Sequence, residues 1–334
     1  MSERRYYSLD AMKAIAAFLV ICIHMPFPGE AGKIIVALAR IAVPFFFMVS
    51  GFFMGTNLKS IKKSIFNIVK LTFLANALYF IWNYLLSIIS TGSFVSYLKL
   101  TFTTNNIINL LLLNESPIAG HLWYLNAYIY VLVIYYITVK YGIVTKLYWL
   151  IPVLLFGDLM FGTYSKVLFN VEVPYLLVRN FIFVGLPYYW TGNFLYRHKK
   201  RILDKKMSNN KSLTFFIVLF TITTLLEKYF LNYFNLIALR EHYLSTTLLV
   251  VSIFLILIKN NNLFFRIKLS DIGRKYSTYI YIIHMLVISV YSITIKTLGI
   301  AFLDKIAPLI VMAISVVLSS LYLELKIRYV MKDN

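Results

Sequence analysis

The chain has 334 residues, of which 60% are apolar and only 14% are charged, and its mean hydropathy is +0.77. Soluble domains are about 45–50% apolar and about 25% charged, so this composition excludes a water-soluble globular protein, a disordered chain and a disulfide scaffold. A single cysteine, Cys22, excludes an intrachain disulfide and a cysteine-based metal site. The net charge of +20 comes from residues that lie between apolar runs, which indicates membrane orientation and no nucleic-acid partner.

The apolar runs predict the fold. A membrane-spanning helix needs about 20 predominantly apolar residues. Ten candidate segments cover residues 9–27, 34–54, 66–89, 121–139, 146–162, 176–196, 213–231, 243–258, 277–295 and 306–325. The weaker run 107–113 is too short to span and is expected at the interface or against the bundle. The sequence therefore predicts an all-α, polytopic membrane bundle of about ten helices that forms one domain over residues 1–334.

The basic residues predict the orientation of this bundle. With the N-terminus in the cytoplasm, 22 Lys and Arg residues fall on the cytoplasmic side, seven on the opposite side and four inside spans. Lys and Arg concentrate in cytoplasmic loops, so an even number of spans with both termini cytoplasmic is expected. The basic runs 197–201 and 266–275 are interpreted first as cytoplasmic anchors, and alternatively as sites for an anionic substrate.

Lys13 and His24 are polar residues within one predicted helix. Eleven residues are about three helical turns, so both side chains face the same way, separated by a rise of about 16 Å. They cannot hold one small group, but they can line one channel for an extended anionic donor, with Lys13 binding phosphate and His24 acting as a base. The alternative is that Lys13 snorkels to the interface and His24 is a satisfied core residue.

Two further features lie beside this pair. Asp10 precedes Lys13 by three residues, which predicts an i,i+3 ion pair. Arg40 falls near the outer end of the second span, where it could meet His24. In the same span, Pro44 predicts a kink and Gly51 a close helix approach.

Three further polar residues, whose placement in or near a membrane span costs free energy, are candidates for an acceptor or a structural site. His121 opens the fourth span and Arg179 begins a polar-to-apolar transition, both at the predicted outer end. His284 lies within the ninth span, where a lone histidine more often hydrogen-bonds between helices than catalyses. Charged groups within spans are by default functional hypotheses. No phosphate-binding glycine loop, metal cluster or Gly-x-Ser-x-Gly elbow occurs, so no metal is predicted.

These residues, taken in order, resemble the acyltransferase 3 family of integral membrane acyltransferases. The motifs that carry the resemblance are Leu9-Asp10-Ala-Met-Lys13 followed by His24, Arg40-x-x-Val-Pro44-Phe-Phe-Phe-Met-Val-Ser50-Gly51-Phe, His121-Leu-Trp-Tyr, and Tyr-Ile-Tyr-Ile-Ile-His284. The spacing Lys13-x10-His24 is similar to the family's Arg/Lys-x10-His signature. The resemblance implies a catalytic His24 and a donor-binding Lys13.

The resemblance also implies a reaction. Members are thought to take an acyl group from cytoplasmic acyl-CoA and to place it on an extracytoplasmic carbohydrate. The expected function is thus an O-acyltransferase of the cell membrane, acetyl-CoA being the co-substrate and an envelope glycan the acceptor. In this reaction Arg40 or Arg179 is expected to stabilise the oxyanion at the thioester or to orient an anionic acceptor.

The sequence departs from the family pattern at two places. The family's Arg-x-x-Arg pair is replaced by Lys59-x-x-Lys62, which keeps the charge for donor binding but loses the bidentate geometry. The acidic pair found near the fourth span in some members is absent from residues 125–128.

A second similarity keeps other functions open. The segment from Arg179 to Pro187 is similar to the transmembrane part of membrane serine racemases. This similarity gives the alternative of a transporter for serine or a similar small metabolite, and a catalytically inactive scaffold is a third possibility.

Overall fold

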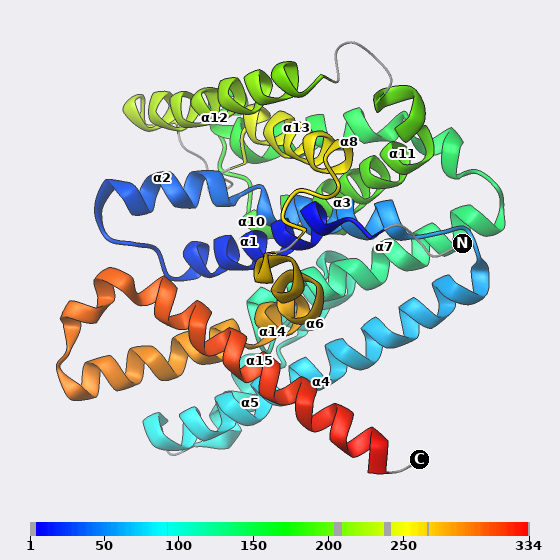
Figure 1. Ribbon diagram of the computed structural model, residues 1–334. Helices are drawn as coiled ribbons and strands as arrows, with labels where there is room; N and C mark the ends of the chain where they lie inside the picture. Colours follow the sequence, from blue (N-terminus) through cyan, green and yellow to red (C-terminus); the bar gives the residue numbers. More distant parts are fainter. Residues whose placement is uncertain (1–4, 92, 204–208, 237–241, 266, 333–334) are drawn as a thin grey trace. The chain divides into compact units, whose positions relative to one another are not determined.

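The computed structural model describes residues 5–91, 93–203, 209–236, 242–265 and 267–332, and every regular element in these ranges is a helix (Figure 1). This finding confirms the all-α prediction. The longer elements are α1 (Tyr7–His24), α2 (Gly29–Ala39), α3 (Ala42–Phe53), α4 (Leu58–Thr91), α7 (Trp123–Lys140), α11 (Leu186–Leu203), α12 (Asn210–Tyr233), α13 (Leu244–Lys259), α14 (Lys268–Leu298) and α15 (Ala307–Lys332).

Shorter helices connect the long ones. They are α5 (Phe94–Thr101), α6 (Thr104–Leu113), η1 (Gly120–Leu122), η2 (Val144–Leu147), α8 (Leu150–Asp158), α9 (Ser165–Phe169), α10 (Tyr175–Val178), η6 (Ala301–Ile306) and two π-helical turns, η3 (Leu159–Thr163) and η4 (Phe181–Gly185).

Among the described residues, eight helices or helix pairs are long and apolar enough to cross a membrane, and they match eight of the ten predicted spans. The other two predicted spans differ from this group. Segment 243–258 corresponds to α13, which has only 16 residues. Segment 176–196 is divided among α10, η4 and α11. The chain is therefore a multi-pass membrane protein, whereas the total of ten spans and the cytoplasmic termini stay predictions.

Two helices extend well beyond the apolar windows that predicted them. α4 begins at Leu58, eight residues before the predicted start, and α14 begins at Lys268, nine residues early. Residues 58–65 and 268–276, which lie outside the predicted spans, are thus helical. The predicted spans start too late because a hydropathy window stops at charged residues, while Lys and Arg are good helix formers. With 34 residues, α4 is about 50 Å long, longer than the hydrocarbon core of about 30 Å.

The second predicted span is interrupted just before Pro44. α2 ends at Ala39, Arg40 and Ile41 form a turn, and α3 begins at Ala42. A proline ring clashes with the carbonyl group four residues earlier, which for Pro44 is that of Arg40. The predicted kink is therefore confirmed, and it places Arg40 in the hinge.

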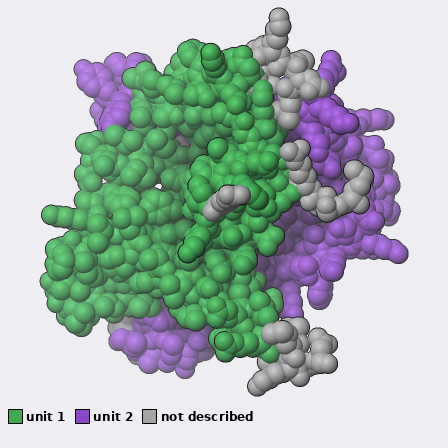
Figure 2. All heavy atoms as spheres, viewed as in Figure 1, with its two compact units in different colours: residues 1–45, 205–226, 245–334 green, residues 46–204, 227–244 purple. Residues whose placement is uncertain are grey.

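The helices group into two compact units, shown in different colours in Figure 2. Unit 1 comprises residues 1–45, 205–226 and 245–334. Within it, α14 and α15 form a helical hairpin and α1 packs along α14 (Figure 1). This packing is close, because a Cβ atom on Gly273 of α14 would lie 1.8 Å from the carbonyl oxygen of Asp10.

Unit 2 comprises residues 46–204 and 227–244. Its α4 packs on α7, and α8 packs on α11. The part of α3 in this unit meets α11 backbone to backbone. A Cβ atom on Gly51 would lie 1.9 Å from the carbonyl oxygen of Tyr189, and one on Gly192 would lie 1.9 Å from that of Met48. The close approach predicted at Gly51 is confirmed. A single domain over 1–334 stays a prediction.

Candidate functional site

The N-terminal end of α1 carries an ion-pair network in unit 1. The carboxylate of Asp10 lies 2.8 Å from Nζ of Lys13 and 3.0 Å from Nε of Arg5. Arg5 also reaches Asp271 on α14, at 2.9 Å. The predicted i,i+3 pair is thus confirmed, and Lys13 is more than a snorkelling residue. Two cations and two carboxylates balance here, while the Lys13 side chain keeps 19% of its surface exposed.

The C-terminal end of α1 brings two histidines together. His24 is the last residue of α1, and its exposed ring lies against that of His284 from α14, with 5.4 Å between the ring centroids. His284 is fully buried, and its Nδ1 lies 2.6 Å from the carbonyl oxygen of Tyr281. Because a carbonyl oxygen only accepts, this Nδ1 carries the proton. In the neutral ring of His284, Nε2 is then the basic nitrogen.

Lys13 and His24 share one uninterrupted helix, as predicted, since α1 runs from Tyr7 to His24. A polar network therefore marks one end of α1 and a histidine pair marks the other, about 16 Å away along the axis. Arg40 belongs to the same unit and is half-buried in the hinge between α2 and α3. The expected contact between Arg40 and His24 stays a prediction.

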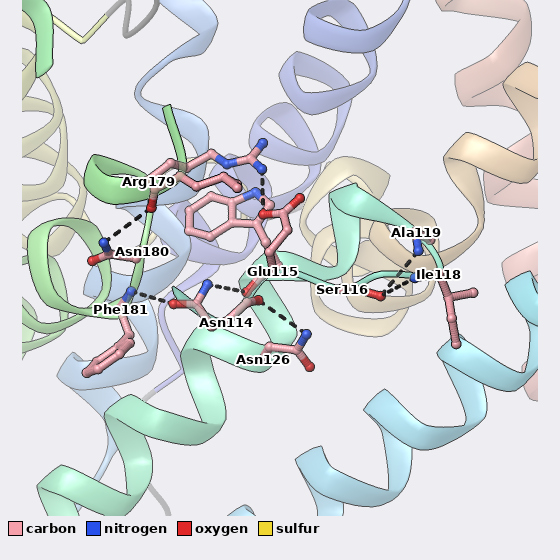
Figure 3. A network of polar contacts seen from close by, with 11 residues as sticks. Asn114, Glu115, Ser116, Ile118, Ala119, Asn126, Arg179, Asn180 and Phe181 are labelled. Atoms are coloured by element: carbon pink, nitrogen blue, oxygen red, sulfur yellow. Dashed lines mark hydrogen bonds and ion pairs between the residues drawn. The ribbon is translucent and has the colours of Figure 1, made fainter. Parts of the chain in front are cut away.

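In unit 2, Arg179 is bound to a glutamate that the sequence analysis did not select (Figure 3). Nη2 of Arg179 lies 2.7 Å from Oε2 of Glu115, and each side chain is only 17% exposed. The guanidinium group also lies over the rings of Tyr175 and Trp123, at 4.5 Å and 5.2 Å from their centroids. Burial raises the pKa of Glu115, and the neighbouring Arg179 cation offsets only part of this rise.

Asparagines hold this ion pair in place. Asn114 adopts a left-handed conformation, φ +56°, at the end of α6. Its side chain donates to the carbonyl oxygen of Trp123 and accepts from the backbone N–H of Phe181, and its carbonyl oxygen accepts from Asn126 (Figure 3). The buried side chain of Asn180 caps η4 by accepting two backbone N–H groups. The chain on both sides of the Glu115–Arg179 pair is therefore fixed.

A family comparison decides what kind of protein carries these sites. The family model described as an acyltransferase domain matches residues 6–325, nearly the whole chain. The chain belongs to the acyltransferase 3 family. It is therefore a membrane acyltransferase. No curated protein and no solved structure matches it.

The remaining predicted residues of the acyltransferase lie in unit 2. His121, in η1, is buried and packs edge-on against the ring of Tyr79, at 4.6 Å between centroids. Lys59 and Lys62 are exposed in the first turns of α4, and Nζ of Lys62 lies 5.5 Å from the ring centroid of Tyr136. The roles proposed for these three residues stay predictions.

The structure also shows polar groups of the acyltransferase that the sequence analysis missed. His242, Asp158 and Tyr188 are all at least 99% buried in unit 2. Nε2 of His242 lies 2.6 Å from the hydroxyl of Tyr188 and 4.0 Å from the carboxylate of Asp158. The available signal was Asp158, a carboxylate inside the fifth predicted span. Among the described residues, no three His, Cys, Asp or Glu side chains gather in a way that could hold a metal ion.

Proposed function

We propose that this acyltransferase moves an acyl group, acetyl, from cytoplasmic acyl-CoA to a hydroxyl group of an envelope carbohydrate at the outer face of the cell membrane. The observation that carries the proposal is the arrangement of α1. One helix has a cation, Lys13, near one end and an exposed histidine, His24, at the other. The distance of about 16 Å between these two residues suits a donor molecule in which the phosphates lie far from the reactive thioester.

The proposed chemistry uses His24 as the general base. Its ring takes the proton from the acceptor hydroxyl while the hydroxyl oxygen attacks the thioester carbonyl carbon. The carbon–sulfur bond then breaks, and the CoA thiolate leaves with the proton that His24 received. A general base of this kind accelerates a reaction by about 10²–10⁴-fold.

His284 is proposed as the positioning residue for this base. Its ring contacts that of His24 and is held by the hydrogen bond of its Nδ1 to the Tyr281 carbonyl oxygen. A held neighbour limits the orientations of the His24 ring, and a base needs a fixed orientation relative to the proton that it removes.

The two arginines are proposed to have different tasks. Arg40, half-buried in the hinge between α2 and α3 and in the same unit as His24, is proposed to stabilise the oxyanion of the tetrahedral intermediate. Arg179 is neutralised by Glu115. A neutralised arginine offers little net charge to an anionic acceptor, so the pair favours a neutral carbohydrate, whose hydroxyl groups can donate hydrogen bonds to the carboxylate.

Turnover by purified protein tests this proposal. The protein in nanodiscs is given acetyl-CoA labelled in the acetyl group, and free CoA and labelled glycan are measured with and without an envelope glycan fraction. We expect CoA release that depends on the protein and on His24. No CoA release, together with uptake of labelled serine into proteoliposomes, would contradict the proposal and favour the transporter.

A further inference from the structure

One end of unit 2 is strongly basic. Segments 54–63, 135–148 and 193–201 contain nine Lys and Arg residues and no Asp or Glu. They converge in space through hydrogen bonds from Asn193 to the carbonyl oxygens of Gly51 and Met54 and to the hydroxyl of Tyr135. The positive-inside rule alone accounts for such a charge excess at a cytoplasmic end, so charge by itself assigns no ligand.

Arg197 differs from the other cations at this end because a buried network orients it. Asn193 is 1% exposed, and its side-chain oxygen accepts from Nε of Arg197 at 3.1 Å and from the hydroxyl of Tyr148 at 2.7 Å. The Asn193 amide nitrogen donates at 3.1 Å to the hydroxyl of Tyr135. The plane of the guanidinium group is thereby set, although the Arg197 side chain is exposed.

An orienting network is unnecessary for a membrane anchor. A snorkelling cation needs only a flexible stem and contact with water or headgroups. Lys199, two residues later, shows this simpler behaviour, with its Nζ 4.3 Å from the ring centroid of the neighbouring Tyr196. Arg197 also interacts with the hydroxyl groups of Tyr135 and Tyr148, which hold it further. The terminal nitrogens of a guanidinium group form a planar fork, the geometry that binds phosphate oxygens bidentately.

The position of Arg197 relates it to the lysines of α4. Tyr135, which accepts from Asn193, is followed directly by Tyr136, whose ring lies below Nζ of Lys62. Asn193, which orients Arg197, and Lys62 therefore contact consecutive residues of α7. Lys59 and Lys62 supply point charges without a fork, and Arg197 supplies the fork that they lack.

We propose that Arg197, oriented by Asn193, binds a phosphate group of the CoA-type donor, with Lys62 as a second cation on the same ligand. This inference rests on the proposed function. It assigns to one residue of the run 197–201 a role in substrate binding, and it leaves the residues after it as anchors.

Direct binding of CoA to the purified protein in nanodiscs of a neutral phospholipid tests this assignment apart from catalysis. Loss of a hydrogen bond to a charged group weakens binding about ten- to hundredfold. We expect a loss of this size for Arg197→Gln, and a smaller one, near tenfold, for Arg197→Lys, which keeps the charge but not the fork. Arg201→Gln and Arg201→Lys, one turn further along α11, are the matched controls and should bind CoA as the wild type does.

Two further measurements show whether the phosphate bound by Arg197 comes from the CoA nucleotide or from a lipid headgroup. 3′,5′-Adenosine bisphosphate, which has the nucleotide phosphates without the acyl-carrying arm, should compete with CoA in the wild type and compete poorly in Arg197→Gln. In nanodiscs that contain an anionic phospholipid, the affinity of the wild type for CoA should stay within about threefold of its value in neutral nanodiscs, once the general effect of surface charge is allowed for. Retention of anionic lipid that falls in Arg197→Gln while CoA binding stays unchanged would identify a lipid-headgroup site and overturn the proposal.

The remaining outcomes distinguish this inference from the proposed function. CoA binding by the wild type with equal affinities for the Arg197 and Arg201 variants would overturn the role of Arg197 and leave the CoA donor in place. Failure of the wild type to bind CoA at all would overturn the donor and this inference together. Thermal unfolding in detergent shows whether each variant is folded.

Discussion

The imidazole rings of His24 and His284 lie side by side in a tilted arrangement in unit 1, with 5.4 Å between their centroids and 44° between their planes. One ring is exposed at the end of α1, and the other is buried in α14 with its Nδ1 hydrogen-bonded to Tyr281. The pair thus joins a histidine accessible to a substrate and a histidine with a set tautomer. This arrangement suits a base that must be both reachable and oriented.

His24→Ala and His24→Asn should both reduce acyl transfer by at least about 100-fold, because neither side chain can act as a base near neutral pH. Asn retains hydrogen-bonding capacity, so a binding or structural role would tolerate Asn better than Ala. The measurement is the rate of labelled acyl transfer, and the control is thermal stability in detergent. Transfer by His24→Asn near the wild-type rate would exclude the base role.

His284→Gln should lower kcat more than it changes KM for either substrate, because His284 positions the base and contacts no substrate in the proposed mechanism. A folded variant with unchanged kcat would make the ring contact purely structural. The control variant is His242→Gln, which changes a buried histidine of unit 2 that lies outside the His24–His284 pair.

Lys13→Ala should weaken the binding of CoA, while Lys13→Arg should retain much of it, because the donor phosphates need the charge. The affinity of the wild type should also fall with salt. Asp10 keeps its second partner, Arg5, in Lys13→Ala, so the fold should survive. Unchanged CoA binding by a folded Lys13→Ala would assign Lys13 to the ion-pair network alone.

The pH dependence of stability should report the buried Glu115. Its pKa is raised by burial. A carboxyl group of this kind stabilises the fold below the pKa of the unfolded chain, about 4.3, and loses that contribution as pH rises through the raised, folded-state pKa. The Tm of the wild type minus that of Glu115→Gln should therefore fall as pH rises across this window.

Glu172→Gln, at a half-exposed glutamate paired with Lys166, controls for the removal of one carboxylate. A wild-type Tm that rises over the same window relative to Glu115→Gln would show that the attraction of Arg179 outweighs burial.

Gly51→Ala should destabilise the protein by about 1–3 kcal/mol or more, the usual cost of forcing atoms into a packed interior. The new methyl group would lie 1.9 Å from the carbonyl oxygen of Tyr189, and a backbone atom cannot move aside as a side chain does. Gly55→Ala, where no atom lies within 4 Å, should leave the Tm unchanged. Equal Tm values for the two variants would contradict the close approach of α3 and α11.

Much of the fold could be predicted from residues that lie close together in the sequence. The apolar runs identified most of the membrane helices, because the bilayer core sets the length and polarity of any segment that crosses it. Helical periodicity placed Lys13 and His24 on one helix, and a spacing of three residues predicted the pair of Asp10 and Lys13. The break at Arg40 followed from the ring of Pro44. Each of these features depends on residues within a few turns of one another.

The partners of the functional side chains were decided only by tertiary structure. His24 and His284 lie near opposite ends of the chain, and Glu115 precedes Arg179 by 64 residues. His242 meets Tyr188 and Asp158 from a separate part of unit 2, and Asn193 of α11 orients Arg197 through contacts with α3 and α7. No local pattern encodes such pairs, because they depend on which helix faces pack together. That choice is made by the fit of side chains and by close approaches such as those at Gly51 and Gly273.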